Sequence, residues 1–208
     1  MSVRTSVYCV SLLLAVACAL AACGSLFSSK VPAPTLYRLS AHPGTPGPEI
    51  AADLSVLKPL VRSGLDTDRI AVSYPDRRLD YYAGARWSAS LDEVVQEMAL
   101  QSFHTHANLR SVSSDASVFS AGYWLEIDVD DFQAEYTTGE AIPTIHVHFS
   151  ARLGKASDRR ILSRFDASAT QLAADNRLTA IIAAYEQAAD TALAEIVAET
   201  ARVLGAKH

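Results

Sequence analysis

Between positions 144 and 153 the sequence alternates strictly between apolar and polar residues. The apolar set is Ile145, Val147, Phe149, Ala151 and Leu153, and the polar set is His146, His148, Ser150 and Arg152. Successive side chains of a β-strand point to opposite faces, so this period of two predicts a strand with one buried and one polar face. Antiparallel sheets commonly leave one face uncovered in this way.

Two neighbouring segments extend this sheet. Residues 122–137 also alternate, and the break in the pattern at Asp130, Asp131 and Phe132 predicts a β-bulge. A third strand is expected at 160–169. The three segments together predict an antiparallel meander. In the first of them, Leu125, Ile127 and Val129 share one face, and the opposite face carries Trp124, Glu126, Asp128 and Asp130.

Two long helices are expected to cover the sheet. The first follows Ser90, which has capping-box spacing to Glu93, and its apolar positions continue to about residues 108–110. The second spans about 175–204. We therefore predict a single α/β domain over 35–208, with a mixed sheet that contains the meander. Four further strands are expected at 35–41, around 54–57, at 69–74 and at 79–87.

The N-terminal segment has the pattern of a secretory signal. One basic residue, Arg4, precedes an apolar run at 7–22, and a helix of this length is short for a hydrocarbon core of roughly 30 Å. The run ends in Leu20-Ala21-Ala22-Cys23, which looks like a lipobox, where bacterial lipoproteins are cleaved and lipidated on cysteine. We expect a signal peptide at 1–22 and lipidation of Cys23. The alternative is an ordinary secretory signal that happens to contain cysteine.

Cysteine usage fits this expectation. The chain has three cysteines, Cys9, Cys18 and Cys23, and only Cys23 would remain after cleavage. Lipidation consumes that thiol, which leaves neither a disulfide nor a cysteine metal site. Residues 23–34 are rich in Gly, Ser and Pro, which predicts a tether between the anchor and the domain. Gly24 occupies the position at which an Asp commonly favours inner-membrane retention, so we expect attachment to the outer membrane, on its periplasmic face.

Charge and motif content argue against several functions. The chain carries 18 Lys and Arg against 23 Asp and Glu, a net charge of −5. Nucleic-acid binding is not expected, because affinity for phosphate backbones comes from clustered basic residues. The sequence contains no G-x-S-x-G, H-E-x-x-H, Walker or G-x-G-x-x-G motif. We expect neither an enzyme nor a cofactor. A periplasmic hydrolase with dispersed catalytic residues stays open as an alternative.

A histidine pair and two aspartates are a weak candidate for a metal site. His146 and His148 share the polar face of their strand, and Asp128 and Asp130 stand on the neighbouring strand. Imidazole and carboxylate groups are common metal ligands, so a site is geometrically feasible. The interpretation that we prefer is a polar strip with cross-strand pairs of histidine and aspartate, and no metal.

The segment before the first helix carries three candidate site residues, Tyr82, Arg86 and Trp87. In a structural interpretation Trp87 packs under that helix, while Arg86 bonds a carboxylate or carbonyl groups. In the alternative these residues form an interface, where Trp and Arg are enriched. The turn Pro75-Asp76-Arg77-Arg78 is interpreted as solvated, with contact to anionic lipid headgroups as the alternative.

The order of these features resembles the ABC-type transport auxiliary lipoprotein (PqiC-like) family. The most specific element is Tyr82-Ala83-x-x-Arg86-Trp87 followed by a helix. Shorter matches lie at Tyr37-Arg38-Leu39, Tyr123-x-Leu125, Ala151-Arg152-Leu153 and Ala183-Ala184-Tyr185. The resemblance covers nearly the whole mature chain, and it implies a three-layer α/β fold like that of anticodon-binding domains, with a mixed sheet between helices.

The same resemblance implies partners. These are an MCE-domain protein and inner-membrane ABC transporter subunits that move lipids or other hydrophobic molecules between membranes. The chain would be a membrane-anchored docking component, which could assemble into a homo-oligomeric ring. Two alternatives stay open: an adaptor of another envelope-assembly machine, and a carrier that binds lipid inside the domain, which would need a cavity.

Overall fold

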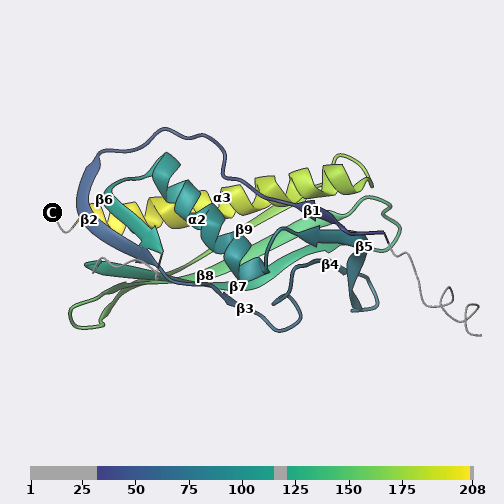
Figure 1. Cartoon of the computed structure of the whole chain (residues 1–208), viewed down its shortest axis with the longest axis horizontal. Coiled ribbons are helices and arrows are strands. Elements are labelled where there is room, and N and C mark those ends of the chain that lie inside the picture. The colour runs from purple at the N-terminus through teal and green to yellow at the C-terminus, as the bar shows by residue number, and fades with distance from the viewer. Residues whose placement is uncertain (1–31, 115–120, 207–208) are drawn as a thin grey trace, which may run out of the picture. The chain divides into compact units, whose positions relative to one another are not determined.

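The computed structural model describes residues 32–114 and 121–206 (Figure 1). The expected signal peptide, Cys23 and nearly all of the expected tether lie outside the described residues. Neither helix in the described part combines the length and the apolar character that a membrane span requires. The helices are α2 (Leu91–His106) and α3 (Leu178–Gly205), and the strands are β1 (Thr35–Tyr37), β2 (Glu49–Val56), β3 (Leu60–Val61), β4 (Arg69–Ser73), β5 (Leu79–Trp87), β6 (Asn108–Ser114), β7 (Tyr123–Glu135), β8 (Thr144–Lys155) and β9 (Ile161–Leu172).

The sheet is organised around β7. One edge of β7 pairs antiparallel with β8, which in turn pairs antiparallel with β9. The other edge is paired by three successive short strands, β2, β3 and β4, which all run parallel to β7. β6 pairs with β2, and β5 and β1 continue the sheet beyond β4. The predicted mixed sheet and meander are confirmed, and the register shift between Val129 and Asp131 is the predicted bulge.

Both helices cover the same face of the sheet and contact each other (Figure 1). The core between the two layers contains the apolar set of β7 and β8, in which Leu125, Ile127 and Phe149 are fully buried. The alternating pattern places polar and charged side chains on the opposite face, where they offer little apolar surface against which another helix could pack. The expected three-layer arrangement is therefore wrong, and the described domain has two layers.

Two details around α2 differ from the prediction. The Ser90 hydroxyl donates to the carboxylate of Asp92 and makes no capping bond to the backbone, so the predicted capping box is not formed. A hydrogen bond to an ionised acceptor is about twice as strong as a neutral one, which favours this arrangement. The helix ends at His106, because residues 108–114 pair with β2 as strand β6. Leu109, which was expected on the helix, lies in that strand.

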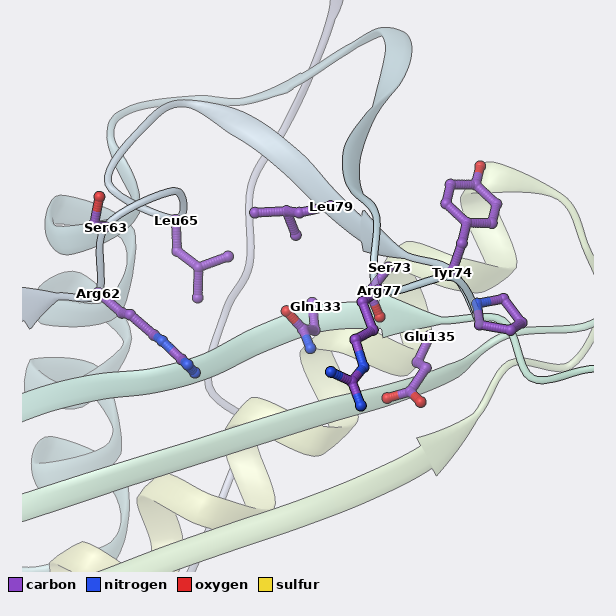
Figure 2. A pocket seen from close by; sticks show the side chains of 10 residues that line it. Arg62, Ser63, Leu65, Ser73, Tyr74, Arg77, Leu79, Gln133 and Glu135 are labelled. Atoms are coloured by element: carbon purple, nitrogen blue, oxygen red, sulfur yellow. The ribbon is translucent and has the colours of Figure 1, made fainter.

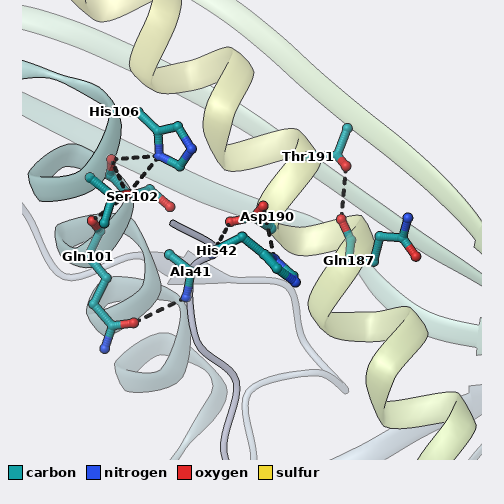
Figure 3. Close-up of polar contacts among 9 residues, drawn as sticks. Ala41, His42, Gln101, Ser102, His106, Gln187, Asp190 and Thr191 are labelled. Carbon is teal, nitrogen blue, oxygen red and sulfur yellow. Dashed lines mark hydrogen bonds and ion pairs between the residues drawn. The ribbon is translucent and has the colours of Figure 1, made fainter. Parts of the chain in front are cut away.

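The segment between β1 and β2 is fastened across both helices (Figure 3). The Ala41 N–H donates to Oε1 of Gln101 on α2 over 3.2 Å, and the His42 N–H donates to Oδ1 of Asp190 on α3 over 2.9 Å. The His42 ring adds a second contact, with 3.1 Å between its Nδ1 and Oδ2 of the same carboxylate. Because Leu39 is also buried, this segment contributes both core and polar contacts to the helical layer.

An ion pair joins β2 to β6 and leads to a pH-dependence prediction. Asp53 accepts hydrogen bonds from Nε of Arg110 over 2.9 Å and from the Ser111 hydroxyl over 2.7 Å. These bonds, the Arg110 bond most strongly, lower the pKa of Asp53 from 3.8 to about 2. Since this pKa is lower in the folded than in the unfolded state, the pair stabilises the fold above about pH 4 and this contribution is lost toward about pH 2.

We expect Asp53→Asn to reduce the free energy of unfolding slightly at neutral pH, because both side chains are partly exposed and water screens the pair. Urea unfolding curves at neutral pH and at about pH 4 and about pH 2 measure the effect. The difference between the variant and the wild type should disappear at the lowest pH. A difference that stays constant over this range would contradict the prediction.

Candidate functional site

The helices leave one face of the meander β7–β8–β9 uncovered, and we call it the open face. Its side chains alternate with the buried ones; they are half-exposed on β7 and β8 and exposed on β9. Six carboxylates and two arginines stand on it, so its charge is predominantly negative. The open face consists of Trp124, Glu126, Asp128, Asp130, Asp131, Gln133 and Glu135 of β7, His146, His148, Ser150 and Arg152 of β8, and Arg164, Asp166, Ser168 and Thr170 of β9.

Hydrogen bonds across the strands connect the middle of the open face. Arg152 lies 3.2 Å from the Glu126 carboxylate and 3.0 Å from the Asp128 carboxylate. The Ser150 hydroxyl lies 2.6 Å from Oδ2 of Asp130 and 2.9 Å from Oδ1 of Asp166. A hydroxyl has one proton to donate, so Ser150 can satisfy only one of these two carboxylates at a time. The other carboxylate keeps unused acceptor capacity for water or a partner.

The structure does not bring the four candidate metal ligands together. The β7 bulge places His148 opposite Asp131 and His146 opposite Gln133. Asp128 is held by Arg152, and Nε2 of His146 lies 3.7 Å from a carboxylate oxygen of Glu135. His148 alone stays near Asp130, with 4.0 Å between its Nδ1 and Oδ2 of that residue. No group of three or more metal-ligating side chains is found among residues 32–114 and 121–206.

A groove of about 440 Å³ lies at the β4 end of the open face (Figure 2). We call it the arginine groove, because the side chains of Arg62 and Arg77 both point into it. Its walls combine these guanidinium groups with apolar side chains and with two polar residues at the end of β7. The lining residues are Arg62, Ser63, Leu65, Ser73, Tyr74, Pro75, Arg77, Leu79, Gln133 and Glu135.

A second hollow, of about 420 Å³, lies at the other end of β7. Leu57, Trp124, Ala156 and Arg159 line it together with Glu126. Gly154 on β8 allows the indole to lie close to the strand, since a Cβ there would come within 2.1 Å of Cζ2 of Trp124. The open face therefore carries a half-exposed tryptophan at one end and borders the arginine groove at the other.

Trp87 lies in the core and not on the open face. It is 2% exposed, and its ring makes edge contacts with Phe132 and Tyr185 at centroid distances of 5.9 Å and 5.3 Å. The Tyr185 hydroxyl donates to the Ala71 carbonyl over 2.6 Å, and burial raises the pKa of this phenol, which keeps it a neutral donor. These contacts link β5, β7, α3 and β4, and they leave little of the Trp87 ring for a partner.

Arg86 and Tyr82 make local contacts on β5. Nη1 of Arg86 donates to both carboxylate oxygens of Asp68, over 2.7 Å and 2.8 Å. The Tyr82 hydroxyl donates to the Tyr136 hydroxyl over 3.4 Å, and burial raises the pKa of Tyr82. Arg86 remains partly exposed, with 44% of its side chain accessible, whereas the neighbouring Trp87 is buried. The three candidate residues therefore do not form one site.

Comparison with known proteins identifies the family. The family model described as ABC-type transport auxiliary lipoprotein component matches residues 37–197. The chain belongs to this family. The resemblance inferred from Tyr82, Arg86, Trp87 and the order of elements is thus confirmed. A search of the curated proteins found no match.

Two solved structures of other proteins have the same fold as this transport auxiliary lipoprotein. Protein XCC0632 from Xanthomonas campestris is 24% identical and has a TM-score of 0.76, over 83% of this chain and 98% of that chain. The hypothetical protein CT253 from Chlamydia trachomatis is 12% identical and has a TM-score of 0.53, over 75% of this chain and 99% of that chain. Both likenesses support the mixed α/β fold that the sequence pattern predicts.

The sequence did not indicate the arginine groove of this family member. Of its two arginines, only Arg77 belongs to a segment that the sequence singled out, the turn after β4. Arg62 and Leu65 follow β3, and Gln133 lies near the end of β7. They come together because β3 and β4 pair with successive parts of β7, and no local pattern encodes that pairing.

Proposed function

We propose that this chain is a non-catalytic, lipid-anchored auxiliary subunit of an ABC-type transport system. The observation that carries the proposal is the family match over residues 37–197. The sequence supports the anchor: a signal peptide at 1–22, lipidation at Cys23 and a tether at 23–34 precede the domain at 35–208. Two or three acyl chains on one cysteine would make membrane attachment lasting. Gly24 favours the outer membrane, with the domain in the periplasm.

The open face is the surface that we assign to partner proteins, namely an MCE-domain protein or the inner-membrane transporter subunits. Its polar groups are accessible and no helix of the described domain covers them. The excess of carboxylates fits a basic partner surface, because complementary charge accelerates encounter and fixes orientation. The energy for transport would come from the ABC transporter, since the chain contains no Walker motif.

Affinity purification of the tagged protein from gently solubilised membranes tests this function. We expect MCE-domain and ABC transporter subunits to be recovered with it and identified by mass spectrometry. Recovery of cell-wall synthesis or outer-membrane insertion factors would support the alternative of an adaptor for another envelope machine. Recovery of no transport subunit would count against the proposal.

A charge reversal on the open face tests the assigned surface. Asp166, whose side chain is 71% exposed, lies on β9, and Glu195 is an exposed carboxylate on α3 in the other layer. We expect Asp166→Lys to lower partner recovery about fivefold or more, because it introduces repulsion against a basic surface. Glu195→Lys makes the same charge change and should leave recovery unchanged. Equal recovery with both variants, at unchanged thermal stability, would exclude the open face as the docking surface.

A further inference from the structure

The lining of the arginine groove has a net positive charge, whereas the open face carries more carboxylates than arginines. Arg62 and Arg77 line it, and Glu135 is its one carboxylate. Arg62 is partly engaged, because Nη1 lies 3.2 Å from Oδ1 of Asp131 and 3.2 Å from the Asp130 carbonyl oxygen. Arg77 makes no ion pair with any described residue. The groove therefore holds at least one guanidinium whose donors are available to an anion.

Apolar side chains stand beside these guanidinium groups (Figure 2). Leu79 lines the groove and is 39% exposed, and Leu65 lines it from a buried position. Tyr74 forms a further wall and carries the Arg78 guanidinium 4.5 Å from its ring centroid. A ligand that satisfied only the arginines would leave the exposed Leu79 in water. The lining thus matches an amphiphile with an anionic head and an apolar body.

We propose that the arginine groove binds an anionic phospholipid, with its phosphate on Arg77 and Arg62 and the start of its acyl chains against Leu79. Guanidinium groups bind phosphate oxygens through paired N–H donors, and these charge-assisted bonds are the strongest class of hydrogen bond in proteins. The net positive charge of the lining favours an anionic head over a zwitterionic one. The carboxylates on the middle of the open face repel the same ligand and confine it to this end.

The point at which the chain enters the domain favours a membrane lipid over a soluble anion. β1 pairs with β5, with Thr35 opposite Ala85, and Leu79 begins the same β5 strand. The groove lies about 20 Å along that strand from the entry point. The eleven residues 24–34 span at most about 40 Å when fully extended. This step rests on the proposed anchor at Cys23, which would keep the groove near lipid headgroups.

Calorimetric titration of the full-length protein in neutral detergent tests the proposal, with a blank titration into detergent subtracted. The three ligands are dihexanoyl phosphatidylglycerol, dihexanoyl phosphatidylcholine and glycerophosphoglycerol, which has the same head without acyl chains. We expect the phosphatidylglycerol to bind about tenfold or more tightly than the other two. Equal affinity for glycerophosphoglycerol would overturn the assignment to a lipid, and equal affinity for the phosphatidylcholine would overturn recognition of net anionic charge.

Two matched variants locate the binding. Arg77 has a φ of 65°, and asparagine tolerates this left-handed conformation, so Arg77→Asn removes the guanidinium without backbone strain. Arg164→Asn makes the same change on the open face outside the groove. We expect about tenfold weaker binding for Arg77→Asn and unchanged binding for Arg164→Asn, both with wild-type thermal stability. Wild-type affinity in Arg77→Asn would overturn the site.

The titration needs no partner protein, and it therefore separates this inference from the proposed function. Binding without recovery of transport subunits would leave the groove assignment standing and remove the transport role. Absence of phosphatidylglycerol binding, with partners recovered, would remove the groove assignment alone.

Discussion

Replacing Trp87 by alanine should lower the free energy of unfolding by about 3–5 kcal/mol. The ring is 2% exposed and packs against Phe132 and Tyr185, so its removal leaves a cavity between the sheet and α3. The loss has two parts, the transfer free energy of the indole and the contacts that its neighbours no longer make. Urea unfolding followed by circular dichroism measures it, with the midpoint and slope fitted separately.

Trp124→Ala is the matched control for this prediction. Trp124 is half-exposed in the hollow at the far end of β7, so the same substitution removes much less buried surface. We expect it to cost less than half as much as Trp87→Ala. If the two variants were equally stable, the aromatic cluster around Trp87 would not have the structural role that its burial implies.

Replacing Cys23 by serine should abolish the incorporation of labelled palmitate into the protein. The expected lipidation forms a thioether at this sulfur, and a serine hydroxyl cannot take its place in that chemistry. The wild-type protein should take up the label, and its mature N-terminal peptide should begin at Cys23 and be heavier by a diacylglyceryl group and an acyl chain. Metabolic labelling and mass spectrometry of the purified protein measure both outcomes.

Cys18→Ser provides the control, because Cys18 lies within the expected signal peptide and is absent from the expected mature protein. This variant should be labelled and processed like the wild type. Label that persisted in Cys23→Ser, or a mature N-terminus elsewhere, would exclude the proposed anchor. It would leave the fold and the family assignment unaffected.

The sequence predicts best those elements in which local pattern and tertiary environment agree. β8 is an example: Ile145, Val147 and Phe149 face the core under the helices, and this burial is what a period of two encodes. The bulge in β7 could also be predicted, because Asp130 and Asp131 cannot both follow the alternation without placing a charge in the core.

The sequence did not predict β6, because its local pattern and its tertiary environment disagree. Its sequence, Asn108–Ser114, contains only Leu109 and Val112 as large apolar residues, and the strand forms because β2 provides a parallel partner. The polarity of one sheet face was likewise predicted, but the position of both helices on the other face depends on the order in which strands are connected. Local periodicity carries no information about that order.

The candidate site was predictable only in part. The polar residues of β7 and β8 were assigned to one face from their alternation, and the structure places them there. The bulge places His146 opposite Gln133 and near Glu135, and Asp128, before the bulge, lies near Arg152. The arginine groove needs residues from three separate parts of the chain, and its prediction would have required the register of β4 against β7.

The pairing of one edge of β7 with β2, β3 and β4 has a consequence for biogenesis. Residues 54–56, 60–61 and 72–73 pair with β7 residues that lie between 123 and 135, so this part of the sheet cannot be completed until β7 is available. Such long-range parallel pairings form slowly, because the entropy cost of closing a long loop comes before any stabilising contact forms. A chain that is threaded across a membrane from its N-terminus would therefore remain translocation-competent until most of it has passed.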